Sequence, residues 1–141
     1  MNAVSDDPRG LQTSLPCPRA TCRTENPADA ERCIRCQVPL RGYARLTVYA
    51  ARLFNEGLRA ARCADITRAR ELFAAVVFWC PMDVQARHAL AMASLAQDDL
   101  DGAEGHWTVL KKRSPSDDLA TRGLAAVQAR KAARLVSQGL T

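Results

Sequence analysis

An internal repeat in the second half of the chain constrains the fold more than any other feature of the sequence. When residues 50–83 are aligned without gaps with residues 84–117, acidic, small, aromatic and proline positions coincide. The matched pairs are Asp65 with Asp99, Ile66 with Leu100, Ala69 with Ala103, Phe73 with Trp107, and Pro81 with Pro115. Self-similarity at a fixed period indicates a structural unit that recurs along the chain and stacks on its neighbour.

The repeated unit is predicted to be helical. Apolar residues recur at helical spacing from 43 to 136, and the chain is rich in Ala and Leu with only 5% aromatic residues. We expect helices at about 43–63, 66–80, 84–97, 100–113 and 117–135. Side chains suited to accept hydrogen bonds from the first turn stand before four of them: Asp65, Asp83, Asp99 and Ser116.

This pattern resembles the tetratricopeptide repeat (TPR), a helix–turn–helix unit of about 34 residues. Two helices approach closely only where a side chain is small, and an adjacent aromatic ring fills the flanking space. Gly57 and Ala91 take the small position of the first helix in each repeat. The resemblance implies a mainly α fold: a TPR-like α-solenoid of about five helices over residues 43–141, with repeats at 50–83 and 84–117 and a capping helix at 117–135. The usual glycine of the inter-helix turn is replaced by Ala64 and Asp98.

Four cysteines precede the helical part in the stretch CPRATCRTENPADAERCIRCQVPL. The pairs Cys17-x4-Cys22 and Cys33-x2-Cys36 suit one tetrahedral metal ion held by four thiolates. A segment this short cannot bury a core of its own, so a bound metal would supply its folding energy. A redox role for Cys33 and Cys36 is the alternative, but no βαβ pattern surrounds them.

The cysteine segment resembles the short zinc ribbons found at the ends of many bacterial proteins. Cys17-Pro18, Asn26-Pro27, Cys33-x2-Cys36 and Pro39-Leu40 carry the likeness. The resemblance implies one structural Zn²⁺ bound by Cys17, Cys22, Cys33 and Cys36, in a ribbon spanning 16–42. Ribbons usually place Gly after the second cysteine of each pair, where the backbone favours positive φ. Here Arg23 and Gln37 stand instead.

The polar N-terminal residues, the lengths of the apolar runs and the net charge indicate the cellular compartment and the class of partner. Residues 1–15 are polar and without period, and we expect a disordered lead with no secretory signal. No apolar run is long enough for a membrane span. We therefore expect a cytoplasmic protein whose cysteines stay reduced. The net charge of +5 is spread along the chain, so it points only weakly to nucleic acid.

The sequence contains no recognisable catalytic motif, and we do not expect an enzyme. Cys63 and Cys80 are interpreted as buried small apolar residues, and His88 and His106 as surface or half-buried histidines. The acidic cluster Asp98, Asp99 and Asp101 is interpreted as helix capping.

The first helix of each repeat is expected to line an inner face that binds a partner. By register this face holds Phe54, Leu58, Arg62, His88, Met92, Leu95, Arg122 and Arg130. Such a surface suits an amphipathic or apolar segment with acidic flanks, and a second copy of the chain or residues 1–42 could cover it instead. We therefore expect a non-enzymatic adaptor. The alternative is a nucleic-acid-binding module that acts through the arginines of the ribbon: Arg19, Arg23, Arg32, Arg35, Arg41 and Arg45.

Overall fold

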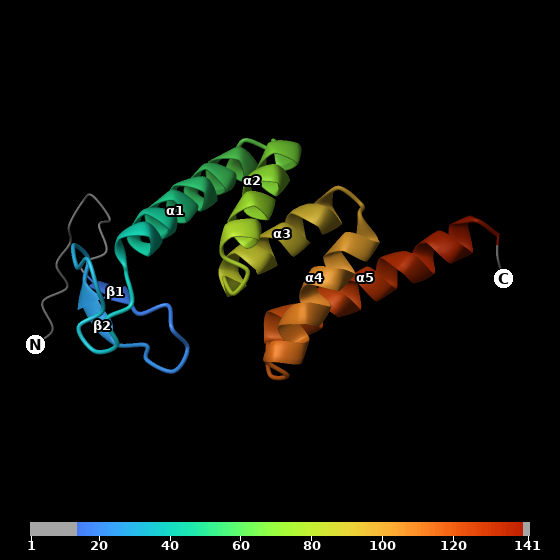
Figure 1. The fold of residues 1–141 in the computed structure, drawn as a ribbon. Coiled ribbons are helices and arrows are strands. Elements are labelled where there is room, and N and C mark those ends of the chain that lie inside the picture. Colours follow the sequence, from blue (N-terminus) through green and yellow to red (C-terminus); the bar gives the residue numbers. More distant parts are fainter. Residues whose placement is uncertain (1–13, 140–141) are drawn as a thin grey trace, which may run out of the picture. The chain divides into compact units, whose positions relative to one another are not determined.

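The structure, a computed structural model, describes residues 14–139, without the side chains at 43–45 and 47. Two short strands are followed by five helices, which confirms the predicted mainly α fold (Figure 1). The predicted disordered lead lies outside the described residues, except for Ser14 and Leu15, which belong to the first strand. No helix in the described part of the chain is both long and apolar enough to cross a membrane.

The described part of the chain divides into two compact units between Val48 and Tyr49. Within the first unit, β1 (Ser14–Pro16) pairs antiparallel with β2 (Glu25–Pro27), and Leu15 lies opposite Asn26. An isolated bridge joins Arg32 to Pro39. The small core of this unit consists of Leu15, Cys17, Cys33 and Leu40.

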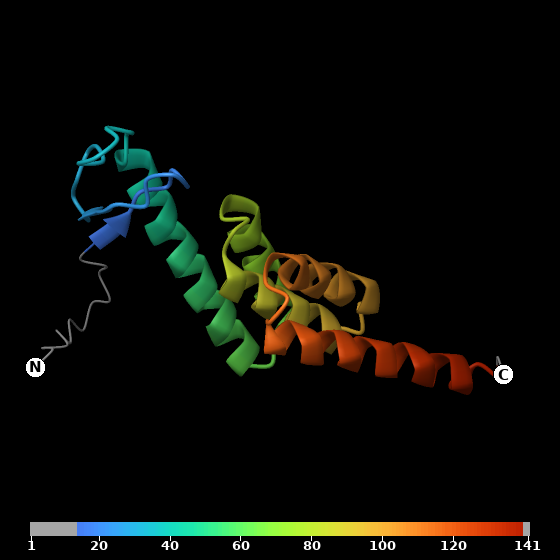
Figure 2. The same cartoon turned by 90° about the horizontal axis from the view of Figure 1, so that it is seen from below.

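All five helices lie close to their predicted bounds, with small differences at the ends. They are α1 (Arg41–Arg62), α2 (Ile66–Trp79), α3 (Val84–Ala96), α4 (Leu100–Arg113) and α5 (Asp118–Ser137). In the second unit, α2 packs on α3, α3 on α4 and α4 on α5 (Figures 1 and 2). We call α1–α2 the first hairpin and α3–α4 the second. The two hairpins and α5 therefore stack in chain order, as the internal repeat predicts.

Aspartates begin four of the helices. The side chains of Asp65, Asp83 and Asp99 accept hydrogen bonds from the backbone three residues later, at 3.1, 2.9 and 3.0 Å, as predicted. The predicted cap Ser116 is wrong, because Asp117 accepts from Ala120 N at 2.9 Å instead. Continuing the repeat alignment places Asp117 opposite Asp83, so the repeat itself identifies the correct residue.

The turns after α1 and α3 share one backbone design. Asp65 N donates to Ala60 O at 2.9 Å and Ala64 N to Ala61 O at 3.0 Å, which is the Schellman pattern of helix ends. Asp98 occupies the equivalent place after α3. Ala64 and Asp98 have φ of 62° and 65°, the left-handed region that favours glycine. The two replacements of the turn glycine therefore occupy the conformation that glycine usually supplies.

Each hairpin is packed around one buried aromatic ring. Phe73 is 3% exposed and lies 5.5 Å from the ring of Phe54. A Cβ added at Gly57 would lie 2.6 Å from Phe73, so only glycine allows α1 to approach α2 this closely. In the second hairpin, Trp107 is 2% exposed and closes against Gly123 of α5, where a Cβ would lie 2.4 Å from the indole.

Candidate metal centre and interaction surface

Cys17, Cys22, Cys33 and Cys36 come together, as predicted, and their four Sγ atoms all lie within 4.8 Å of one another. Cys17 Sγ is 3.5 Å from Cys36 Sγ, and Cys22 Sγ is 3.7 Å from Cys33 Sγ. A disulfide needs about 2.05 Å between its sulfurs, so these thiols are free. Four sulfurs at this spacing can hold one metal ion in a closed tetrahedral site.

Two tight backbone turns aim the cysteine pairs at this common centre. Cys22 N donates to Arg19 O at 2.9 Å, and Gln37 N donates to Cys33 O at 3.0 Å. Each turn ends in the left-handed region, at Arg23 with φ of 51° and Gln37 with φ of 61°. Both residues therefore occupy a conformation that favours glycine.

Backbone N–H groups lower the pKa of the cluster thiols, whereas burial raises it. Burial raises the pKa of Cys17 to about 12. The N–H of Cys36, with that of Arg35, lowers the pKa of Cys33 to about 6. The hydroxyl of Thr24, 3.2 Å from Cys22 Sγ, lowers the pKa of that thiol. Four neighbouring thiolates repel one another, so a cation at their centre is what would allow all four to ionise together.

Asn26 holds the cysteine turns in place through three hydrogen bonds. Asn26 is part of the resemblance to zinc ribbons, which by itself assigns it no structural role. Its amide is 1% exposed and donates to Leu15 O and Thr24 O at 3.3 and 2.8 Å. Its Oδ1 accepts from Ile34 N at 2.8 Å, inside the turn that carries Cys33 and Cys36. One buried side chain thus joins both strands to the second turn. The only sequence signal for this role is an amide residue among the cysteines.

The predicted inner face is partly buried. Phe54 and Leu58 pack against the core of the first hairpin, and Leu95 packs against the core of the second. Met92 is 53% exposed. The arginines Arg62, Arg122 and Arg130 are exposed, although Arg122 pairs with Asp118 at 2.9 Å and Arg130 donates to Leu95 O at 2.7 Å. Met92 is therefore an exposed apolar member of this face, and Arg62, Arg122 and Arg130 are exposed basic members.

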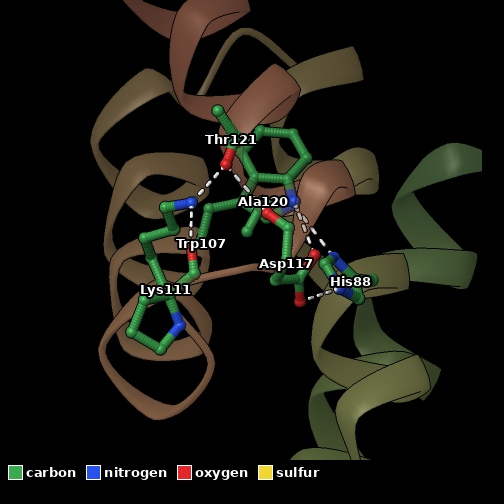
Figure 3. Close-up of polar contacts among 7 residues, drawn as sticks. His88, Trp107, Lys111, Asp117, Ala120 and Thr121 are labelled. Atoms are coloured by element: carbon green, nitrogen blue, oxygen red, sulfur yellow. Dashed lines mark hydrogen bonds and ion pairs between the residues drawn. The ribbon is translucent and has the colours of Figure 1, made fainter.

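His88 is engaged within the helical array (Figure 3). Trp107 Nε1 donates to His88 Nδ1 at 3.2 Å, and His88 Nε2 lies 2.9 Å from a carboxylate oxygen of Asp117. Because an indole N–H can only donate, Nδ1 is the acceptor and the neutral ring carries its proton on Nε2. The repeat aligns Phe54 with His88, so a ring contact in the first hairpin is replaced by a hydrogen-bonded chain in the second.

The remaining cysteines and acids differ in part from expectation. Cys63 is exposed, so its assignment as a buried residue is wrong, and Cys80 is half-buried with its pKa raised by burial. Asp99 caps α4, as predicted. Asp101 forms an ion pair with Lys131 at 2.8 Å, and Asp98 pairs with Arg134. His106 is half-buried, and burial lowers its pKa.

Comparison of the chain with protein-family models, with curated proteins and with solved structures finds no match.

Proposed function

We propose that the four cysteines bind one structural Zn²⁺. The carrying observation is the sulfur geometry. A tetrahedron with Zn–S bonds of about 2.3 Å has sulfurs about 3.8 Å apart, and two of the sulfur pairs here are separated by 3.5 and 3.7 Å. An all-thiolate donor set favours zinc over hard cations. Four protein ligands leave no open position, which is typical of structural sites, and the resemblance to zinc ribbons supports the same assignment.

Metal analysis of the purified, reduced protein tests this assignment. We expect one zinc per chain, no zinc in Cys33→Ser, and full zinc in the matched variant Cys63→Ser, since Cys63 lies outside the cluster. Removal of zinc by a chelator should unfold the ribbon and leave most of the helical circular dichroism, because the helices have their own core. A zinc content near zero in the reduced wild type would refute the proposal.

We further propose that the chain is a non-enzymatic adaptor, in which the ribbon accompanies a TPR-like array that binds a segment of a partner protein. Hairpins that stack in step with the internal repeat support this, because such arrays present an extended surface built from successive repeats. On the inner face, the exposed thioether of Met92 suits an apolar side chain, and Arg62 suits acidic flanks.

Substitution of Met92 is the sharpest test of this role. Met92→Asp places a charge on an exposed position, so it should leave the helices folded and weaken binding of a partner captured from the source cells about tenfold or more. Val136→Asp is the matched control, because Val136 is 69% exposed at the end of α5. Leu58→Asp is a poor choice, since Leu58 packs against the core. Unchanged partner binding by Met92→Asp would refute the proposal that the inner face binds the partner.

Nucleic-acid binding through the ribbon is the second candidate. Its supporting observation is that Arg19, Arg23, Arg32, Arg35 and Arg41 are all exposed. No aromatic residue precedes Tyr43, so the ribbon offers no platform for base stacking. A salt titration of binding to generic DNA and RNA separates the two functions, because contacts to phosphates give a steep dependence on salt.

A further inference from the structure

Four large apolar side chains are exposed where α2 turns into α3. We call residues 78–84 the first corner. Phe78 is 75% exposed, Trp79 50%, Met82 69% and Val84 47%, and the two rings meet edge to face with their centroids 5.3 Å apart. Scattered apolar residues are ordinary on a protein surface, but four within one short segment form a concentrated patch.

The next corner of the same chain provides an internal comparison. We call residues 112–118, which the repeat aligns with the first corner, the second corner. Its backbone is built in the same way: Cys80 N donates to Val76 O at 2.7 Å and Asp83 N to Cys80 O at 3.0 Å, while Ser114 N donates to Leu110 O at 2.8 Å and Asp117 N to Ser114 O at 3.0 Å. The four apolar residues of the first corner are replaced in the second by Lys112, Arg113, Ser116 and Asp118.

The second corner therefore forms the same backbone hydrogen bonds with polar side chains at these four positions. The exposed rings, thioether and isopropyl group of the first corner are therefore not required to form the turn or to cap α3. Their contribution to folding is also limited, because between 47% and 75% of the surface of each residue stays in water. A role in binding accounts for them better than a role in the fold.

Two guanidinium groups converge beside this apolar patch. Arg87 Nη2 and Arg113 Nη1 both donate to Pro81 O, at 3.0 and 3.1 Å. Among residues 14–139, neither arginine has a carboxylate within ion-pair distance, and the nearby carboxylate of Asp83 accepts from Ala86 N. Burial and the charge of Arg113 lower the pKa of Arg87, so an anion placed here would relieve an unfavourable pairing of like charges.

We propose that the first corner docks a peptide segment of a partner protein, in which a large apolar side chain lies next to one or two carboxylates. The apolar side chains would supply affinity, and the paired arginines would orient the segment through its carboxylates. A discrete pair of guanidiniums held on one carbonyl favours a defined carboxylate over the diffuse charge of a lipid surface. This surface differs from the inner face around Met92 and goes beyond the adaptor function proposed above.

The test uses the full, zinc-loaded chain and a displayed library of random short peptides. We expect enriched peptides to combine Asp or Glu with Phe, Leu, Ile or Trp. A synthetic peptide of the enriched sequence should bind the wild type and lose tenfold or more of its affinity for the corner-exchanged variant Phe78→Lys/Trp79→Arg/Met82→Ser/Val84→Asp. That variant carries the residues of the second corner, so it is expected to fold. Arg113→Gln should weaken binding about three- to tenfold and reduce its dependence on salt.

A control variant makes the test specific. Val136→Lys adds a charge at an exposed apolar site far along α5 and should bind the peptide as the wild type does. Equal binding of the peptide by the corner-exchanged variant would overturn the proposal. So would enrichment of peptides without acidic residues, self-association abolished by the exchange, or exchange-sensitive binding to phosphatidylcholine–phosphatidylglycerol vesicles without peptide enrichment.

Discussion

Ala64 allows a sharp test of the backbone conformation in the turn after α1. Its φ of 62° is left-handed, and its side chain is exposed, so the methyl group contributes little packing. This conformation costs an L-residue other than glycine about 1–2 kcal/mol. Glycine loses about 0.4–1 kcal/mol through the greater freedom of its unfolded chain. The balance of these two effects predicts that Ala64→Gly raises the free energy of unfolding by about 0.5–1 kcal/mol.

The same substitution elsewhere should have the opposite sign. Ala74 is exposed in the middle of α2, where glycine costs about 1 kcal/mol relative to alanine. For a unit of this size, about 1 kcal/mol moves the midpoint by about 4–8 °C. Thermal unfolding followed by far-UV circular dichroism should therefore show a higher midpoint for Ala64→Gly and a lower one for Ala74→Gly. Asp98→Gly is a less clean test, because it also removes an ion pair with Arg134.

The result that would refute this reasoning is a midpoint for Ala64→Gly that is lower than or equal to that of the wild type, measured where Ala74→Gly lowers the midpoint as expected. That result would mean that the turn does not hold Ala64 in the left-handed region, and that α1 ends in another backbone conformation.

Three further predictions follow from single contacts. Gly123→Ala should destabilise the helical unit by about 1–3 kcal/mol, because the added Cβ would meet the buried Trp107 ring. Gly105→Ala is the matched control: nothing lies within 4 Å of its Cβ, so it should stabilise the unit by about 1 kcal/mol. Denaturant unfolding measures both changes. Asn26→Ala should weaken zinc binding about ten- to a hundredfold, as loss of an outer-sphere partner does, measured by chelator competition; unchanged affinity would mean that its three hydrogen bonds do not support the site. In folded protein saturated with added Zn²⁺, Cys63 should react first with a thiol reagent, because it is exposed and lies outside the cluster. Mass spectrometry of the labelled peptides measures the order, and a faster reaction of a cluster cysteine would contradict the prediction.

Much of the local structure follows from the sequence, because it depends on neighbours along the chain. The aspartates before the helices predict where the helices begin, since a carboxylate needs only the backbone three residues later. The spacing of the cysteines predicts their cluster, since each pair shares one short turn. Arg23, Gln37, Ala64 and Asp98 stand where the resembled families usually carry glycine, and the structure places all four in the left-handed region. The internal repeat also identifies Asp117 as the residue that caps α5, where the prediction of Ser116 is wrong.

Contacts between elements distant in the sequence were decided by the tertiary structure alone. Helical periodicity places Phe54 and Leu58 on one face, but their half-burial depends on how α2 and α3 pack against that face. The hydrogen bonds of His88 need Trp107 from α4 and Asp117 from the turn before α5. The exposure of the first corner likewise depends on which helices end there. Burial is set by the neighbours that the fold assembles around a side chain, and a pattern along one helix records only one side of that contact.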